Sequence, residues 1–263
     1  MDISFSKYHG AGNDFVIIDT RKSSLNLNSN QIKQLCHRRF GIGADGLMLL
    51  QNSAQETFKM KYYNSDGIEG TMCGNGGRCI VAFASDLGLL GTGTKTSFEA
   101  IDGVHHAQKL GHNNISLCMN STQIPVRFED GFFVDTGSPH FVKFVPDISQ
   151  IDAETEGRLL RFEKRFAPKG TNVNFVQILL TGLRIVTFER GVEAITLACG
   201  TGAVAAAVCF AELENKNSLQ IPVISAGGEL FVTLEKKPDG YHNIVLSGPA
   251  MRVFTGTFSL VSE

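Results

Sequence analysis

A short motif that occurs twice constrains this chain more than any other feature. Residues 72–76 read MCGNG and residues 198–202 read ACGTG, and an apolar, alanine-bearing segment follows each. A strand-like segment ending in polar residues precedes both motifs, with Asn64 and Arg190 at equal distances before the two cysteines. A repeated order of strand, polar loop, Cys-Gly-x-Gly and helix predicts two similar lobes related by pseudo-symmetry.

The pattern of apolar residues predicts an α+β chain in which strands dominate. Strands are expected at residues 15–19, 46–51, 58–63, 97–101, 115–119, 132–135, 141–145, 173–179, 183–188, 229–235 and 251–260. Helices are expected at residues 29–37, 76–87, 152–165 and 201–214. Because strands and helices do not alternate regularly, we do not expect the parallel sheet of a βαβ protein. The turn at residues 111–114 is expected to separate the lobes.

Composition narrows the class of protein. With 43% hydrophobic and 19% charged residues, the chain is typical of soluble globular proteins. A formal net charge of −2 predicts neither a basic face for nucleic acid nor an acidic tail. The N-terminus does not resemble a secretory signal, and the most apolar stretch, residues 79–90, is too short to span a membrane. We therefore expect a cytoplasmic protein that binds neither nucleic acid nor membranes.

The cysteines divide into two groups. A thiol at the start of a helix lies near free backbone N–H groups and the positive end of the helix dipole, which lower its pKa from ~8.5 towards neutrality. One such cysteine alone would be interpreted as a small buried hydrophobe, but two in matching glycine-rich settings, Cys73 and Cys199, favour a catalytic role. The remaining cysteines are predicted to be structural; they are Cys36, Cys79, Cys118 and Cys209.

No cofactor or metal is predicted. Residues 41–46 match G-x-G-x-x-G, but a dinucleotide site needs that pattern between a strand and a helix, and here a helix precedes it and a strand follows. No Cys-x-x-Cys occurs, so a structural zinc site is not expected. No lysine motif for a pyridoxal phosphate Schiff base is evident.

Several polar residues allow two interpretations on local grounds. His140 begins a strand after a turn and fits a hydrogen-bonded turn histidine as well as a catalytic one. Glu189 and Arg190 form a pair that most often lies on a surface. Asn13 and Asn172 stand at strand edges, where asparagine usually serves turns.

Taken together, the motifs resemble those of the diaminopimelate epimerases, in order, from Phe5 to nearly the C-terminus. The segments that carry the resemblance are KYHGAGNDFVIID (7–19), RRFGIGADG (38–46), YYNSDG (62–67), MCGNGGRC (72–79), GSPHFV (137–142), GTNVNFV (170–176), FERGV (188–192) and LACGTGA (197–203). The resemblance implies two lobes, each a curled, mostly antiparallel sheet around a central helix, with the active site between them. Residues 1–113 with about 251–263 would form the lobe that carries Cys73, and residues 114–250 the lobe that carries Cys199.

The resemblance also implies a role for each matching residue. Cys73 and Cys199 match two catalytic thiols, and His140 and Glu189 match catalytic groups that poise them. The substrate-binding positions implied are Asn13, Asn64, Gly74, Asn75, Asn172, Glu189, Arg190, Gly200 and Thr201. The implied activity is cofactor-independent epimerisation of L,L-2,6-diaminopimelate to the meso form, in lysine and peptidoglycan precursor biosynthesis. The partner is a small-molecule substrate, and the oligomeric state, a homodimer included, is left open.

Three positions depart from the family pattern. Ser138 stands where asparagine often precedes Pro-His, so an amide contact is expected to be lost or replaced by water. Gly46 stands where some members carry glutamine. The segment between Arg190 and Cys199 is one residue longer than the common form and lacks its usual Glu-Thr pair.

Two other functions are weighed against the epimerase. A proline or hydroxyproline racemase would share the two-thiol chemistry, but proline has no distal polar end for Asn64 and Arg190 to bind. A non-catalytic binding or redox-sensing module would use the same thiols in reversible disulfide chemistry, with no isotope exchange into any amino acid.

Overall fold

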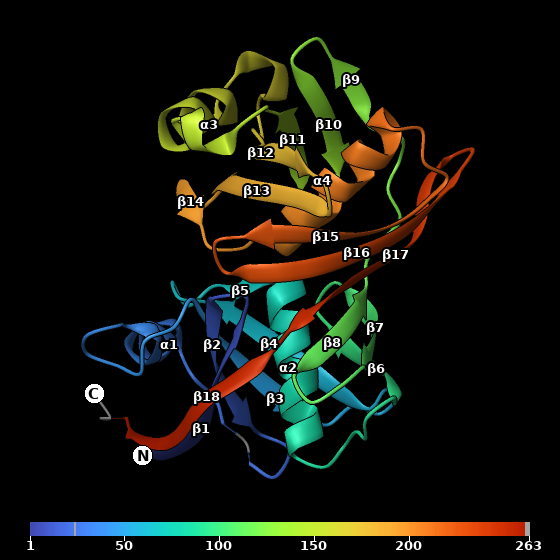
Figure 1. Ribbon diagram of the computed structural model, residues 1–263. Coiled ribbons are helices and arrows are strands. Elements are labelled where there is room, and N and C mark those ends of the chain that lie inside the picture. Colours follow the sequence, from blue (N-terminus) through green and yellow to red (C-terminus); the bar gives the residue numbers. More distant parts are fainter. Residues whose placement is uncertain (24, 261–263) are drawn as a thin grey trace. The chain divides into compact units, whose positions relative to one another are not determined.

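Two buried helices organise the chain, one in each of its two compact units. The computed structural model describes residues 1–23 and 25–260. The first unit comprises Met1–Leu117 and Pro249–Glu263, and the second comprises Cys118–Gly248. Helix α2 (Gly74–Asp86) belongs to the first unit and α4 (Gly200–Leu213) to the second, and most side chains of both helices are buried (Figure 1).

In the first unit, strands run from both ends of the chain around α2. Their bounds are β1 (Asp2–Gly10), β2 (Asn13–Asp19), β3 (Gly46–Gln51), β4 (Phe58–Asn64), β5 (Glu69–Gly70), β6 (Lys95–Ala100), β7 (Gly103–Lys109), β8 (Asn114–Cys118) and β18 (Met251–Ser259). Strand β18 pairs antiparallel with β1, so the C-terminal end of the chain lies beside the N-terminal end (Figure 1). A short helix, α1 (Ser29–Cys36), connects β2 to β3.

The second unit has its own set of strands around α4. They are β9 (Val126–Phe128), β10 (Gly131–Asp135), β11 (Pro139–Phe144), β12 (Asn172–Leu179), β13 (Gly182–Glu189), β14 (Ala194–Thr196), β15 (Ser218–Ser225), β16 (Gly228–Lys237) and β17 (Gly240–Pro249). Helix α3 (Ala153–Arg161) connects β11 to β12.

The two units repeat one strand-pairing scheme. In the first, β1–β2 is antiparallel, β2–β3 parallel, β3–β4 and β4–β5 antiparallel, and β4–β6 parallel. In the second, β10–β11, β11–β12, β12–β13, β13–β14 and β13–β15 follow in the same sense. In both, the helix that begins after the cysteine comes between the fourth pair and the fifth. This confirms the predicted α+β class and gives the repeated sequence motif a structural counterpart.

The structure differs from the sequence predictions at three boundaries. The turn at residues 111–114 does not separate the units, because it connects β7 to β8, which pair with each other within the first unit. The division falls instead between Leu117 and Cys118. Helix α3 ends at Arg161, before the end expected near residue 165, and a 3₁₀ turn (Lys164–Phe166) follows. Among the helices that the structure describes, none is long and apolar enough to cross a membrane.

Candidate active site

Cys73 lies directly before the first turn of α2. It is the N-cap residue, and its sulfur accepts a hydrogen bond from the backbone N–H of Gly76 at 3.2 Å. A Cβ atom on Gly76 would lie 3.1 Å from that sulfur, closer than side chains normally pack. Glycine at this position therefore lets the thiol lie over the free N–H groups of the helix start, where a thiolate is favoured.

Cys199 occupies the same place at the start of α4. It is the N-cap residue of that helix, and a Cβ atom on Gly202 would lie 3.3 Å from its sulfur and 2.6 Å from Oδ1 of Asn174. The second glycine of each Cys-Gly-x-Gly motif thus has the same function, which is to leave room for the sulfur. The residues between each cysteine and that glycine, Gly74-Asn75 and Gly200-Thr201, are the first two of each helix.

His140 reaches Cys199 through Thr201. The Nε2 atom of His140 lies 2.9 Å from Oγ1 of Thr201, which lies 3.5 Å from the sulfur of Cys199. On the other side of the ring, the amide Nδ2 of Asn174 lies 3.1 Å from Nδ1 of His140. The Oδ1 atom of Asn174 accepts from Thr187, and this fixes the amide so that its nitrogen faces the ring.

These contacts determine the tautomer of His140. Because Nδ1 accepts from Asn174, Nε2 carries the proton and donates to the hydroxyl of Thr201. That hydroxyl is then left to donate its own proton towards Cys199. Complete burial, with a smaller contribution from the charge of Arg190, lowers the pKa of His140 to about 3, so the ring is neutral at physiological pH.

Asn172, Ser138 and Arg190 form a second cluster in the same unit. The amide nitrogen of Asn172 donates to the hydroxyl of Ser138 and to the carbonyl of Pro139, both at 2.9 Å. Its Oδ1 accepts from the backbone N–H of Arg190 at 2.9 Å. The Ser138 hydroxyl also lies 3.4 Å from the guanidinium of Arg190. Ser138 therefore has protein partners, where the sequence suggested only a lost amide contact.

Arg190 follows the last residue of β13, Glu189, which is half-buried. Among residues 1–23 and 25–260, Arg190 forms no ion pair with a carboxylate. The segment beyond it folds back as β14 on β13, and Glu193 within it pairs with Arg161 at 3.0 Å. The lengthened connection to Cys199 is thus an ordered strand pair, and it leaves the Arg190 guanidinium available to a ligand.

In the first unit, a chain of hydrogen bonds with an ion at each end links Asn13 to Asn75. The Nδ2 of Asn13 donates to Asp45 at 2.7 Å, and the Nδ2 of Asn75 donates to Oδ1 of Asn13 at 3.3 Å. The guanidinium of Arg78 donates to Oδ1 of Asn75 at 2.9 Å. A carboxylate only accepts and a guanidinium only donates, so the two ions fix the orientation of both amides.

Arg78 is completely buried one turn into α2. Its other hydrogen bonds go to the carbonyls of Gly74 and Pro249. Burial lowers its pKa, opposed by the thiols of Cys79 and Cys73. In the described part of the chain its hydrogen-bond partners are all neutral, so it places a positive charge close to the start of the helix.

Asn64 is the last residue of β4 and is exposed. Its Oδ1 accepts a hydrogen bond from the hydroxyl of Tyr62 at 2.8 Å. Gly46, the first residue of β3, is paired with Asn64 across the sheet. In the corresponding pair of the second unit, Asn172 stands opposite the position after Phe188, which is Glu189.

The repeated scheme gives the two thiols different surroundings. Strand register places Phe15, Met48 and Tyr62 in the first unit where His140, Asn174 and Thr187 lie in the second. Those three residues of the first unit lie beside an apolar thioether and two rings near Cys73, whereas the second unit offers a polar network to Cys199.

The other cysteines lack such a setting. Cys36, Cys79 and Cys209 are buried, and Cys118 is exposed. Burial raises the pKa of Cys36 to about 12 and raises those of Cys79 and Cys209 well above the usual value, so their thiols stay protonated.

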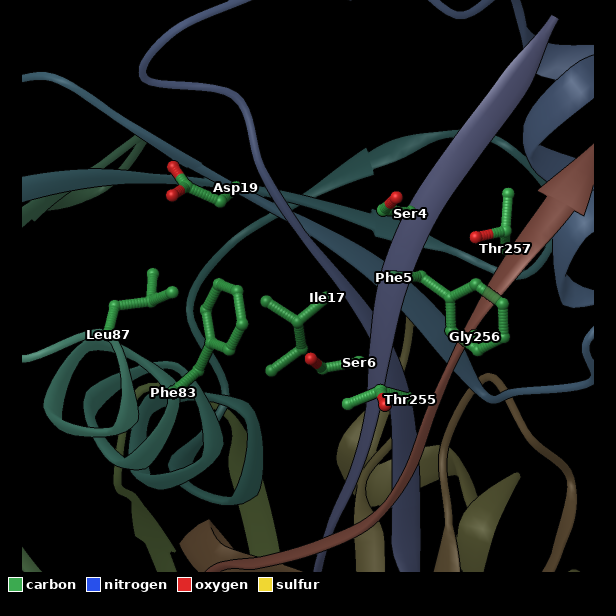
Figure 2. A pocket seen from close by; sticks show the side chains of 10 residues that line it. All are labelled: Ser4, Phe5, Ser6, Ile17, Asp19, Phe83, Leu87, Thr255, Gly256 and Thr257. Carbon is green, nitrogen blue, oxygen red and sulfur yellow. The ribbon is translucent and has the colours of Figure 1, made fainter.

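A cavity of about 440 Å³ in the first unit lies at the other end of α2. Figure 2 shows Phe83 and Leu87 from the end of the helix on one side of it and Thr255–Thr257 of β18 on the other. It contains no cysteine or histidine, so it is not the site of the thiol chemistry. Within residues 1–23 and 25–260, no cluster of three or more His, Cys, Asp or Glu is arranged to hold a metal ion.

Sequence reasoning missed four residues that support the predicted ones. Asn174, Asp45, Arg78 and Tyr62 each contact a predicted site residue or its partner. For Asn174 a signal was present, since a second asparagine two residues after Asn172 in a buried strand faces the same side.

Comparisons with known proteins agree on one family. A family model described as diaminopimelate epimerase matches residues 5–119 and 132–253. The diaminopimelate epimerase of Flavobacterium psychrophilum is 46% identical over 95% of this chain and 98% of its own length. That of Chlorobaculum tepidum is 45% identical over 95% of this chain and 99% of its own.

Solved structures show the same fold at low identity. A phenazine biosynthesis protein of the PhzF family from Bacillus anthracis superposes with a TM-score of 0.78 at 14% identity, covering 99% of this chain and 100% of that one. A hydroxyproline epimerase from Agrobacterium vitis, with bound trans-4-hydroxy-L-proline, gives 0.71 at 13% identity, covering 97% and 92%.

Proposed function

Because the chain belongs to the diaminopimelate epimerase family, we propose that it interconverts L,L- and meso-2,6-diaminopimelate, with Cys73 and Cys199 as the acid and base. The observation that carries this proposal is the matched placement of the two thiols. Each is the N-cap of the buried helix of its own unit, with a glycine three positions later that leaves room for the sulfur.

In the proposed reaction, one thiolate removes the α-proton and the other thiol delivers a proton to the opposite face of the same carbon. The C–H bond broken and the C–H bond formed balance, so the reaction needs no oxidant or reductant. After turnover the two sulfurs have exchanged protonation states, and the reverse reaction uses them in the opposite roles. The mechanism requires one α-carbon to meet both thiols.

The α-hydrogen is a very weak acid, so the negative charge that develops must be stabilised. Free N–H groups at the first turns of α2 and α4, beginning at Gly74-Asn75 and Gly200-Thr201, are suited to the carboxylate next to the reacting carbon. The buried charge of Arg78 adds to the positive potential at the start of α2. We propose that these groups replace a pyridoxal phosphate cofactor.

The different surroundings of the thiols support a division of protonation states. At Cys199, neutral His140 holds the Thr201 hydroxyl so that its proton is directed to the sulfur, which favours a thiolate. Glu189, at the end of β13, is proposed to assist in poising the thiols. Two thiols with separated pKa values supply the one acid and one base that the reaction needs.

The far end of diaminopimelate is itself an amino acid, and the polar residues away from the thiols suit it. Arg190 has a fork that fits a carboxylate and pairs with no protein carboxylate among the residues described. Both N–H groups of Asn172 are already engaged, so this residue can offer only the remaining lone pair of Oδ1, an acceptor for an ammonium group. Asn64 and Asn13 complete the set proposed to bind substrate.

A proline racemase would have no use for this distal set, because proline lacks a second polar end. The proposed substrate places the protein in the synthesis of lysine and of peptidoglycan precursors, in the cytoplasm. Its partner is the small-molecule substrate, with neither nucleic acid nor membrane, and a homodimer stays open.

The test is to incubate the pure protein with L,L-diaminopimelate in deuterated water. The proposal expects meso product carrying deuterium at the inverted carbon, without added pyridoxal phosphate. Cys73→Ala and Cys199→Ala should each abolish epimerisation, since each variant lacks the acid or base on one face. Either variant epimerising at more than a small fraction of the wild-type rate, without added thiol, would contradict the two-thiol mechanism.

A further inference from the structure

Tyr62 lies in a slot formed by glycines on the two strands that flank β4. A Cβ atom on Gly46 of β3 would lie 2.5 Å from ring carbon Cε2, and one on Gly70 of β5 would lie 3.1 Å from Cδ1 and Cε1. Phe15 packs edge-on against the ring, with the two ring centroids 6.0 Å apart. Neighbours on three strands therefore hold the phenol ring in one place.

The hydroxyl of this fixed ring determines how Asn64 is oriented. It donates to Oδ1 of Asn64 at 2.8 Å. With the carbonyl end of the amide occupied, the Nδ2 end is the part that Asn64 presents to a ligand, and this end only donates. An exposed asparagine without such a partner would rotate between donor and acceptor orientations.

The phenol lies on the face of the sheet that carries the candidate active site. Tyr62 is paired across β3 and β4 with Met48. The thioether sulfur of Met48 lies 3.6 Å from the Cβ position of Gly76, the residue whose N–H bonds the sulfur of Cys73. Tyr63, the next residue, faces the opposite side and packs on the apolar core of the unit.

We propose that Tyr62 is a positioning residue for substrate specificity, whose hydroxyl fixes Asn64 as a hydrogen-bond donor to the distal carboxylate of diaminopimelate. This inference rests on the function proposed above. A carboxylate accepts only, so an amide locked with its nitrogen outward recognises it and disfavours an ammonium group at the same place.

The inference also explains Gly46, where related sequences carry glutamine. A Cβ atom there would meet the ring of Tyr62 and would lie 2.7 Å from the carbonyl oxygen of Tyr63. A glutamine side chain is therefore excluded from this chain. The phenol ring fills that space, and the Tyr62–Asn64 pair supplies a polar group at the same edge of the sheet.

Tyr62→Phe tests the proposal, because it removes the hydroxyl and keeps the ring that fills the slot. Loss of one hydrogen bond that orients a ligand group is expected to lower kcat/KM for L,L-diaminopimelate about three- to tenfold. Tyr63→Phe is the matched control. It removes a hydroxyl from the neighbouring residue on the other face of the same strand, and should leave kcat/KM unchanged.

A double-mutant cycle separates positioning from a general structural effect. If the hydroxyl acts through Asn64, then Tyr62→Phe in an Asn64→Ala background should cause no further loss of kcat/KM. Full additivity of the two losses overturns the inference, as does an unchanged kcat/KM in Tyr62→Phe. A wild-type protein that does not epimerise diaminopimelate overturns the proposed function itself, a result distinct from an active wild type with an unaffected variant.

Discussion

The Nε2 atom of His140 lies 2.9 Å from the hydroxyl oxygen of Thr201. Since Asn174 occupies the other ring nitrogen, the imidazole donates to the hydroxyl, and the hydroxyl proton is directed to the sulfur of Cys199, 3.5 Å away. The histidine thus acts on the thiol through the first turn of α4. This arrangement makes Thr201 a donor to sulfur as well as a residue at the carboxylate-binding helix start.

Thr201→Val tests that relay, because valine has the shape of threonine without the hydroxyl. A hydrogen bond to a charged group contributes about 1.5–3 kcal/mol. We therefore expect kcat/KM for diaminopimelate to fall roughly ten- to a hundredfold. Thr201→Ser keeps the hydroxyl and should retain most of the activity. Equal activity of the valine variant and the wild type would show that the hydroxyl has no part in poising Cys199.

The buried His140 should make the fold sensitive to acid. Its pKa is about 3 in the folded protein, against about 6.5 for an unperturbed histidine. Above pH 6.5 both states hold the neutral ring, so the contribution to stability is complete there. Between pH 6.5 and 3 the unfolded state takes up the proton and the folded state does not, and the free energy of unfolding falls by up to about 1.4 kcal/mol per pH unit.

Urea unfolding of the wild type and of His140→Gln at pH 7, 6, 5 and 4 measures this effect. The glutamine variant is expected to be less stable at pH 7, but its free energy of unfolding should depend less steeply on pH, by about one proton. The comparison uses the slopes, because other groups titrate in both proteins. Parallel slopes would mean that the histidine is protonated in the folded state.

Asp45 should matter for catalysis although it lies outside the thiol chemistry. It holds Nδ2 of Asn13 at 2.7 Å and so fixes that amide in the chain that runs through Asn75 to Arg78. In Asp45→Ala the amide of Asn13 is free to rotate, and we expect kcat/KM to fall at least tenfold, the effect of one lost charge-assisted hydrogen bond. Steady-state kinetics with diaminopimelate measures it.

Arg38→Gln is the control for that variant. Arg38 also pairs with Asp45, at 2.6 Å, but its side chain is 60% exposed. Exposed ion pairs contribute little, so removing it should leave kcat/KM within about twofold of wild type. An equal loss in both variants would assign the effect to the ion pair and not to the orientation of Asn13.

The elements around both thiols could be predicted because their apolar pattern is strong. Strand β3 was expected at residues 46–51 and has those bounds, and the central helices begin within two residues of the expected positions. Strand β7 was missed because Ala107 is the one fully buried residue in it. Its β conformation comes from backbone hydrogen bonds to β6 and β8, which an apolar period does not report.

Charged and amide side chains in the site follow from contacts far along the chain. Arg78 would be expected on a solvated helix face, yet the carbonyls of Gly74 and Pro249 and the amide of Asn75 allow it to be buried. A Cβ atom on Gly10 would lie 3.3 Å from its guanidinium, so a glycine in β1 makes room for it. None of this is encoded in the local spacing around residue 78.

Cys79 and Cys209 offer matched controls for the catalytic thiols. Both lie inside the central helices with no exposed surface, and burial raises their pKa values well above the usual range. Cys79→Ala and Cys209→Ala are expected to lower the free energy of unfolding by about 1 kcal/mol and to leave kcat unchanged. Loss of activity in a variant that keeps its stability would show that a third thiol takes part in the reaction.

Arg190 should decide which substrate is accepted. Its guanidinium lies 3.4 Å from Ser138, and the structure describes no carboxylate paired with it, so a substrate carboxylate is its expected partner. Loss of a two-point charged contact in a desolvated pocket costs on the order of 2–5 kcal/mol when its partner stays buried. Arg190→Lys cannot reproduce the fork and should lower kcat/KM for diaminopimelate by well over tenfold. Lysine, which has a distal amine but no distal carboxylate, should be a poor substrate for the wild type. Steady-state kinetics on both compounds measures this, and a wild type that epimerises lysine or proline as fast as diaminopimelate would remove both the role of Arg190 and the choice of substrate.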